Sequence, residues 1–253
     1  MPDGGTAASF FDATAKRYDS AYDAQTADGH ALRARMAVVL RLVGEGPGAA
    51  LDAGMGPGRL CAELESRGWT AHGVDAAPEM VSAARGRLPV AADRLLVGRI
   101  ESLPFPDARF DVVVATGVLE YAQLPAALRE LARVLRPGGR AVVSYPNPVA
   151  AYGIWKTRLY YPAVRVVKTV LGRGRNAVPP GTGRIRPRPF QALLAEAGLE
   201  AQTVEYTSYL PVLSPLELLV PRLAMRAGER LEGSGVRLGA ALATQVVYEA
   251  QNG

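Results

Sequence analysis

The sequence has little cysteine or histidine and no long uninterrupted hydrophobic run. Its 253 residues include one cysteine and two histidines, which excludes an internal disulfide framework and leaves no cysteine-rich metal site. We therefore expect no metal, and a buried apolar role for Cys61. No stretch approaches the roughly 20 uninterrupted apolar residues of a membrane-spanning helix, and the N-terminus lacks the basic-then-apolar pattern of a signal peptide. These absences predict a cytoplasmic protein.

Acidic residues are absent from one long interval. Between Glu130 and Glu196 there is no Asp or Glu, whereas the same interval holds twelve Arg and Lys. In the rest of the chain the acids outnumber the bases. A basic region of this kind attracts anionic partners, which indicates an anionic substrate or peripheral contact with a membrane through residues 152–188. The alternative is a solvated face that only aids solubility.

The most informative stretch runs from Leu51 to Leu60, which predicts a buried strand, a glycine turn and the start of a helix. Glycines at alternate positions, Gly54, Gly56 and Gly58, let the backbone turn sharply and approach a ligand. The following helix N-terminus offers N–H groups to a polar or anionic ligand. A dinucleotide fingerprint needs a sixth-position glycine where this chain has Arg59, and a P-loop needs Gly-Lys-Ser/Thr, which is missing.

Strands and helices alternate after this turn. The expected strands are Trp69–Asp75, Leu95–Ile100, Phe110–Ala115 and Arg140–Tyr145, and Leu124–Leu135 is an amphipathic helix. The apolar run at Phe110–Ala115 is typical of a parallel strand buried on both faces. Asp75 follows Gly54 by 21 residues, an interval at which a strand-end carboxylate can accept hydrogen bonds from ribose hydroxyls. Asp75 can also cap the helix that begins after Ala77.

Several of these motifs resemble one family. Asp52-x-Gly54-x-Gly56-x-Gly58 resembles motif I of the class I S-adenosylmethionine (SAM)-dependent methyltransferases, of the small-molecule type with a methyltransferase domain 11/25-like pattern. The link Leu103-Pro-Phe-Pro to Phe110 and the turn Arg136-Pro-Gly-Gly139 are similar to the same family. The resemblance covers about residues 49–146. It implies an α/β fold, a Rossmann-like seven-stranded, mostly parallel sheet with helices on both faces and an antiparallel last strand.

The same resemblance implies a cofactor and its site. The cofactor would be SAM, and its product S-adenosylhomocysteine (SAH). The residues implied to bind it are Tyr18, Asp52, Gly54, Gly56, Gly58, Asp75, Ala76, Met80, Arg99, Ile100, Glu101 and Thr116. Tyr18 belongs to a segment, Ser9–Tyr22, that resembles the N-terminal cover of such enzymes, and Met80 matches the apolar residue that packs on adenine. The family commonly has Gly-Asp where this chain has Gly98-Arg99, and an arginine cannot accept a bond from the adenine amino group.

Candidates for acceptor chemistry come from residues near the expected ends of strands. Methyl transfer is an in-line displacement in which positioning does much of the catalysis, although an acceptor can need a base. The candidates are His30, Glu120, Tyr121 and Tyr145, whereas His72 lies mid-strand and is expected to be structural. The sequence has no Asn/Asp-Pro-Pro-Tyr motif after the fourth strand and no recognisable RNA-binding module, which disfavours nucleic acid as the acceptor.

The chain is therefore predicted to form a single domain over residues 1–253. Its parts are an N-terminal helical cover (1–45), a SAM-binding core (46–146), a basic insert (147–186) and a C-terminal helix, strands and apolar cover (187–253). The predicted function is methyl transfer from SAM to an oxygen or carbon acceptor on a small molecule of secondary metabolism or a lipid-like compound. The alternatives are a nicotinamide-dependent oxidoreductase on a similar fold and a methyltransferase-like binding or scaffold protein.

Overall fold

The computed structural model describes residues 4–147, 187–209 and 243–253, with a few isolated residues between these ranges. Most of the predicted basic insert, and of the apolar cover predicted between residues 209 and 227, lies outside the described residues. Within the described ranges, no helix is long and apolar enough to cross a membrane.

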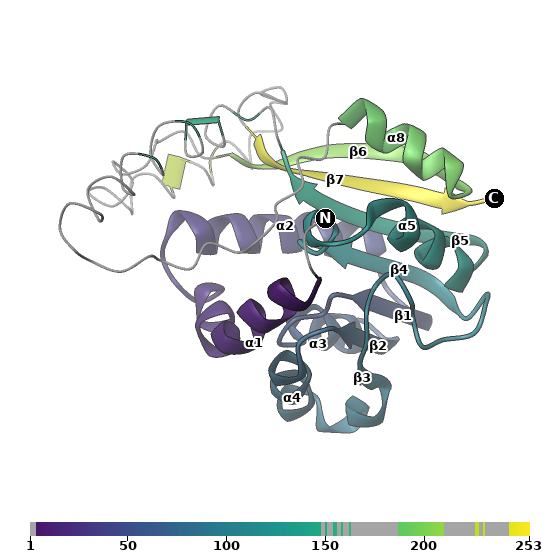
Figure 1. Cartoon of the computed structure of the whole chain (residues 1–253), viewed down its shortest axis with the longest axis horizontal. Coiled ribbons are helices and arrows are strands. Elements are labelled where there is room, and N and C mark those ends of the chain that lie inside the picture. The colour runs from purple at the N-terminus through teal and green to yellow at the C-terminus, as the bar shows by residue number, and fades with distance from the viewer. Residues whose placement is uncertain are drawn as a thin grey trace.

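A seven-stranded sheet forms the centre of the described structure. Its strands are β1 (Gly48–Ala53), β2 (Trp69–Asp75), β3 (Leu95–Val97), β4 (Phe110–Thr116), β5 (Leu135–Pro146), β6 (Leu199–Tyr209) and β7 (Ala243–Asn252). They lie in the order β3-β2-β1-β4-β5-β7-β6, from bottom to top in Figure 1. Strands β1 to β5 are parallel, and β7 runs antiparallel to both of its neighbours. The predicted Rossmann-like sheet with an antiparallel last strand is confirmed.

Helices cover both faces of this sheet because successive strand residues point to opposite sides. Leu51 and Val113 pack with α5 (Leu124–Val134) and α8 (Pro187–Glu196) on one face. Ala50 and Val112 pack on the other face with α2 (Ala27–Val43), α3 (Arg59–Ser66) and α4 (Pro78–Arg87). The result is a three-layer α/β/α arrangement whose apolar core lies on either side of the central strands β1 and β4.

Two strand boundaries differ from the prediction by three residues or more. The third strand ends at Val97 instead of Ile100, because residues 99 to 102 form a tight turn in which the Ser102 N–H donates to the Arg99 carbonyl. The fifth strand begins at Leu135 instead of Arg140, because Leu135 already pairs with Phe110 before a bulge in the register.

The N-terminal helix α1 (Gly4–Ala21) belongs to neither of the two helical layers and packs on α4. Ala15 of α1 contributes to a small apolar cluster with Ala77 and Met80, and Phe11 and Tyr18 pack against it. Helix α1 therefore lies beside the carboxyl end of β2, where the predicted cofactor residues are found (Figure 1).

Candidate active site

The glycine turn has the shape that its sequence predicts, but its three glycines serve different purposes. All three adopt left-handed φ angles, 88° at Gly54, 52° at Gly56 and 76° at Gly58. A Cβ at Gly54 would lie 2.7 Å from Val118 Cβ, and one at Gly58 would lie 2.7 Å from Ala84 Cβ. At Gly56 the nearest atom would be Tyr18 Cε1 at 3.8 Å. Gly54 and Gly58 thus permit close packing, whereas Gly56 keeps open the space that it faces.

The backbone N–H groups of the glycine turn itself form hydrogen bonds within the protein, whereas the predicted role of the N–H groups at the start of α3 stays a prediction. Gly54 and Met55 both donate to the Val74 carbonyl, at 2.7 and 3.0 Å, and the Gly58 N–H donates to the Met55 carbonyl. The Gly56 N–H donates to Asp75 Oδ2 at 2.9 Å. These bonds hold the turn against β2, so the turn contributes shape rather than an anion-binding nest.

Asp75 binds the backbone beside the start of α4, although the N-cap residue of that helix is Ala77. Its Oδ1 accepts a hydrogen bond from the Ala77 N–H at 2.9 Å, close to the start of α4, while its Oδ2 accepts the Gly56 bond. Burial raises the pKa of Asp75, and the backbone hydrogen bonds oppose that shift. Each carboxylate oxygen has two lone pairs, so both retain an acceptor site for a ligand hydroxyl.

Asp52 is a buried acid at the end of β1. It is 1 % exposed, and the Cys61 thiol lies 3.9 Å from its Oδ2. No described group forms a hydrogen bond with its Oδ1. Burial, followed by repulsion from Asp75, raises the pKa of Asp52 to about 7. Burial and the Asp52 charge also raise the pKa of Cys61, which keeps the thiol protonated and agrees with its predicted buried role.

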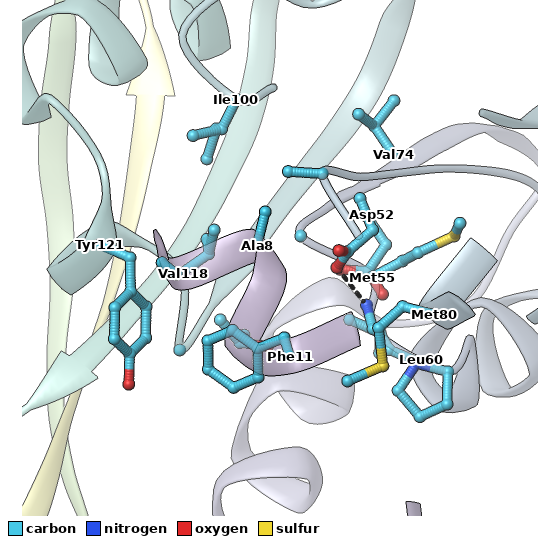
Figure 2. A pocket seen from close by; sticks show the side chains of 18 of the residues that line it. Ala8, Phe11, Asp52, Met55, Leu60, Val74, Met80, Ile100, Val118 and Tyr121 are labelled. Atoms are coloured by element: carbon cyan, nitrogen blue, oxygen red, sulfur yellow. Dashed lines mark hydrogen bonds between the residues drawn. The ribbon is translucent and has the colours of Figure 1, made fainter. Parts of the chain in front are cut away.

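A cavity that is partly open to solvent joins these residues to α1. In Figure 2, Asp52, Met55 and Met80 lie on one side of it, and Phe11, Val118 and Tyr121 lie on the other. The Phe11 ring packs edge to face against the Tyr121 ring, with their centroids 5.2 Å apart. The centroid of the Tyr18 ring lies 5.9 Å from that of Phe11 and 6.1 Å from that of Tyr22. The cavity thus has a mixed polar side at the strand ends and an aromatic side from α1.

The cavity brings together most of the residues predicted to bind the cofactor. Its lining includes Tyr18, Asp52, Gly54, Gly56, Asp75, Ala76, Met80, Arg99, Ile100, Glu101 and Thr116. Gly58 is the one predicted cofactor residue outside this lining, because its α-carbon faces α4. Arg99 pairs with Glu101 at 3.2 Å, and the same Glu101 oxygen accepts the Gln123 N–H. Arg99, which stands where the family commonly has Asp, therefore lines the cavity and is held there by its ion pair with Glu101.

The four candidate acceptor residues are not brought together. Tyr121 lines the cavity, whereas His30, Glu120 and Tyr145 do not. His30 is buried inside α2, and Tyr145 is buried in the core, where its ring lies 4.8 Å from the ring of Phe190. Their positions give no support to a role in deprotonating an acceptor. His72 is also buried and packs edge-on against Phe110, as a structural residue would.

Glu120 is buried in the short 3-10 turn η2 (Leu119–Tyr121) next to the cavity. Its Oε2 has no hydrogen-bond partner in the described part of the chain, and burial raises the pKa of its carboxyl.

Sequence reasoning missed two groups of charged residues beside the cavity. Arg35 of α2 is 7 % exposed although it is an arginine. Asp19 of α1 binds two arginines, Arg59 and Arg87, that flank the glycine turn. Arg35 lies on the apolar stripe of α2 with Leu32, Met36 and Val39, and a charged residue on such a stripe was the available signal. The Asp19 partners lie 40 and 68 residues away in the sequence, so no local pattern predicts them.

Comparison with known proteins identifies the family. Residues 51–143 match the family model of the methyltransferase domain. An uncharacterized methyltransferase of Mycobacterium tuberculosis (strain H37Rv) is 32% identical over 176 residues, which are 68% of this chain and 63% of that protein. The chain belongs to the class I SAM-dependent methyltransferases. SAM is accordingly its cofactor, as the resemblance implied.

The methyltransferase is also similar to a second curated protein and to a solved structure. The malonyl-[acyl-carrier protein] O-methyltransferase of Serratia marcescens is 40% identical over 137 residues, 52% of this chain and 49% of that protein. The chain thus spans less than two thirds of the length of either curated relative. A solved SAM-dependent methyltransferase from Thermotoga maritima shares the fold, with a TM-score of 0.61, 19% identity and coverage of 96% of this chain and 98% of that one.

Proposed function

We propose that this methyltransferase transfers a methyl group from SAM to an oxygen or carbon acceptor on a small molecule. The observation that carries the proposal is the cavity between the glycine turn and the aromatic residues of α1. Its lining runs from Asp52 and Asp75 at the strand ends to Phe11 of α1 and Tyr121 of η2. A lining that combines these two sides supports the joint binding of a cofactor and an acceptor.

The residues on the strand side fit the parts of the cofactor. Both Asp75 oxygens keep an acceptor site that suits the ribose hydroxyls, and charge-assisted hydrogen bonds of this kind are short and strong. Met80 and Ile100 are buried and apolar, and they suit the faces of an adenine ring. The open space in front of Gly56, which a Cβ would enter, suits the close approach of the cofactor to the backbone.

The aromatic side of the cavity suits the acceptor. Phe11 and Tyr121 contribute ring surface next to Ala8 and Val118, so this side favours an acceptor with an apolar body. Burial raises the pKa of Tyr121, so its hydroxyl stays protonated near neutral pH and orients an acceptor by hydrogen bonding. Bound SAM supplies an electrophilic methyl group, and the chain's contribution is to hold the acceptor in line with it and to exclude water.

The proposal is tested by calorimetry followed by a product screen. SAM and SAH should bind the purified protein, and Asp75→Ala should remove most of that binding. A screen with methyl-labelled SAM against small-molecule extracts should then transfer label to a carbon- or oxygen-linked product. If neither SAM nor SAH binds, the proposal fails. Transfer only to nitrogen would leave the enzyme class intact and overturn the acceptor assignment.

The two alternatives from the sequence make different predictions. An oxidoreductase should be stabilised against thermal unfolding by NAD(P)H and not by SAM. A binding or scaffold protein should capture its partner without binding SAM or SAH at all. The family match disfavours both alternatives.

The anionic or lipid-like character of the acceptor remains part of the proposal. It is supported by the run of twelve basic residues without an acid between Glu130 and Glu196. Such a region raises the local concentration of anions.

A further inference from the structure

We propose that Glu101 accepts a hydrogen bond from the 6-amino group of the cofactor's adenine, and that Arg99 positions Glu101 for this contact. The inference rests on the proposed function, because it concerns the cofactor of that reaction. It begins from a disagreement between the chain and its family. The family commonly has an aspartate where this chain has Arg99, and an arginine side chain carries hydrogen-bond donors only. The adenine amino group therefore needs a different hydrogen-bond acceptor in this protein.

The turn that contains Arg99 lies beside the carboxyl end of β2. Strands β2 and β3 pair as far as Asp75, and the Gly98 N–H donates to the Asp75 carbonyl at 3.0 Å. Beyond Gly98, the residues Arg99, Ile100 and Glu101 line the cavity. The turn therefore extends the cavity outward from Asp75, and it places a carboxylate two residues after the position where the family commonly has one.

Glu101 is held through one of its two carboxylate oxygens. Its Oε1 accepts the Gln123 N–H at 3.0 Å, at the start of α5, and Arg99 Nη2 lies 3.2 Å from the same oxygen. In the part of the chain that the structure describes, no group donates to Oε2. The Glu101 side chain is 14 % exposed and lines the cavity. Because a carboxylate oxygen only accepts hydrogen bonds, Oε2 is left for a donor on the ligand.

The order of the acids along the sheet edge indicates which ligand donor reaches Glu101. Asp52 lies near the end of β1, Asp75 ends β2 and Glu101 follows β3, and these strands are neighbours in the sheet. SAM carries its donor groups in the same order along its length, as an ammonium, the ribose hydroxyls and the adenine amino group. Neighbouring strands lie about 4.8 Å apart. With the ribose hydroxyls opposite Asp75, the amino group is the donor that remains at the β3 end.

Arg99 acts through Glu101. Among the described residues, its side chain forms a hydrogen bond with Glu101 alone, so it restrains the carboxylate and accepts nothing from the base. The Gln123 N–H holds the same oxygen independently of Arg99. Arg99 is thus a positioning residue, and its loss should matter less than the loss of Glu101.

Two ligands that differ only in the 6-amino group test this assignment. They are SAH and its deamino analogue, in which purine replaces adenine. Isothermal titration calorimetry should show that the wild type prefers SAH by about ten- to hundredfold, the range of one hydrogen bond to a charged group. Glu101→Gln should lose most of this preference, because it binds SAH more weakly and the analogue as the wild type does. Arg99→Met should lose a smaller part of it.

A third ligand gives a test by gain of binding. In Glu101→Gln the amide oxygen should stay on the Gln123 N–H and Arg99, which turns the amide NH₂ toward the base. This NH₂ group can donate to the 6-oxo group of S-inosylhomocysteine, whereas the wild-type carboxylate repels that oxygen. The variant should therefore bind S-inosylhomocysteine more tightly than the wild type does.

The control is Glu65→Gln, the same substitution in a matching arrangement. Glu65 Oε1 accepts the Ala71 N–H at 2.7 Å and a bond from Arg94 at 2.9 Å, as Glu101 Oε1 does from its two donors. Glu65 does not line the cavity, so this variant should bind all three ligands as the wild type does.

Equal wild-type affinity for SAH and the deamino analogue would overturn the inference, and this measurement serves even if Glu101→Gln does not fold. An equal loss for both ligands in Glu101→Gln, an unchanged preference, or no gain for S-inosylhomocysteine would also overturn it. An unchanged preference in Arg99→Met would overturn the role assigned to Arg99. Failure of the wild type to bind SAH would overturn the proposed function as well.

Discussion

The side chains of Asp19 and Arg59 join the N-terminal helix to the glycine turn, with Arg59 Nε 2.7 Å from Asp19 Oδ1. Arg59 follows Gly58 directly and begins α3. Arg87, at the end of α4, donates to the same carboxylate and to the Pro57 carbonyl within the turn. Asp19 therefore links α1 to both helices that flank the turn, and α1 carries the aromatic residues of the cavity.

Asp19→Asn is expected to accelerate SAH dissociation and to weaken its binding by about three- to tenfold. The three side chains are 25–29 % exposed, and partly exposed ion pairs each contribute about 0.2–1 kcal/mol. Stopped-flow competition would measure the dissociation rate. Asp23→Asn is the control, because the Asp23 carboxylate pairs with Arg59 and is 71 % exposed; its effect should be smaller. An unchanged rate in Asp19→Asn would show that the ion pairs do not restrain the cover.

The affinity for SAH should fall as the pH drops through about 7. The raised pKa of Asp52 means that its carboxyl gains a proton in this range, and a neutral carboxyl loses its attraction for the cofactor's ammonium group. Calorimetry between pH 5.5 and 8.5, about 1.5 units to either side of that pKa, would measure this dependence. Asp52→Asn should bind more weakly at high pH and show a flatter pH profile. A profile identical to that of the wild type would contradict this prediction.

The stability of the ligand-free protein should show the opposite trend. The pKa of Asp52 is about 7 in the folded chain against 3.8 in the unfolded one, so between these values the folded state binds more protons. The contribution of Asp52 to stability is therefore largest at low pH and declines as the pH rises from about 4 to 7. Thermal melts of the wild type and Asp52→Asn across this range isolate the contribution, and parallel curves would refute it.

Alanine at two positions of the turn should separate binding from stability. Gly56→Ala places a methyl group in open space facing the cavity, so SAH binding should drop strongly while the left-handed φ costs about 1–2 kcal/mol of stability. Gly58→Ala adds a clash with Ala84 of α4 to a similar backbone cost, so it should melt at a lower temperature than Gly56→Ala. Melting curves and calorimetry on both variants test this, and equal melting temperatures would contradict it.

Charge reversal in the basic insert tests the anionic partner. Replacing Arg158 and Arg165 by Glu should raise the acceptor Michaelis constant or abolish binding to anionic vesicles, because the attraction is electrostatic. SAM affinity should stay unchanged. If neither property changes, this region is a solvated surface.

Local sequence accounted for the core of the fold and for the strand side of the cavity. Three features were readable from short stretches of sequence. They are the glycine turn at Gly54, the carboxylate of Asp75 at the end of β2, and the apolar run that forms β4. A strand-turn-helix unit fixes where its own ends lie, and parallel strands bring those ends to one edge of the sheet. This is why ten of the eleven predicted cofactor residues from Asp52 to Thr116 line one cavity.

The tertiary structure decided what lies on the other side of that cavity. Whether Tyr121 faces the cavity while His30 and Tyr145 are packed away from it depends on how α1, α2 and the closing strands pack on the sheet. The same packing buries Arg35 next to Gly117 and brings Asp19 to Arg59 and Arg87. Spacing along the chain determines a motif, whereas contacts between distant segments depend on the packing of the whole core. The sequence therefore determined which cofactor this protein uses, and the fold decided which charges surround it.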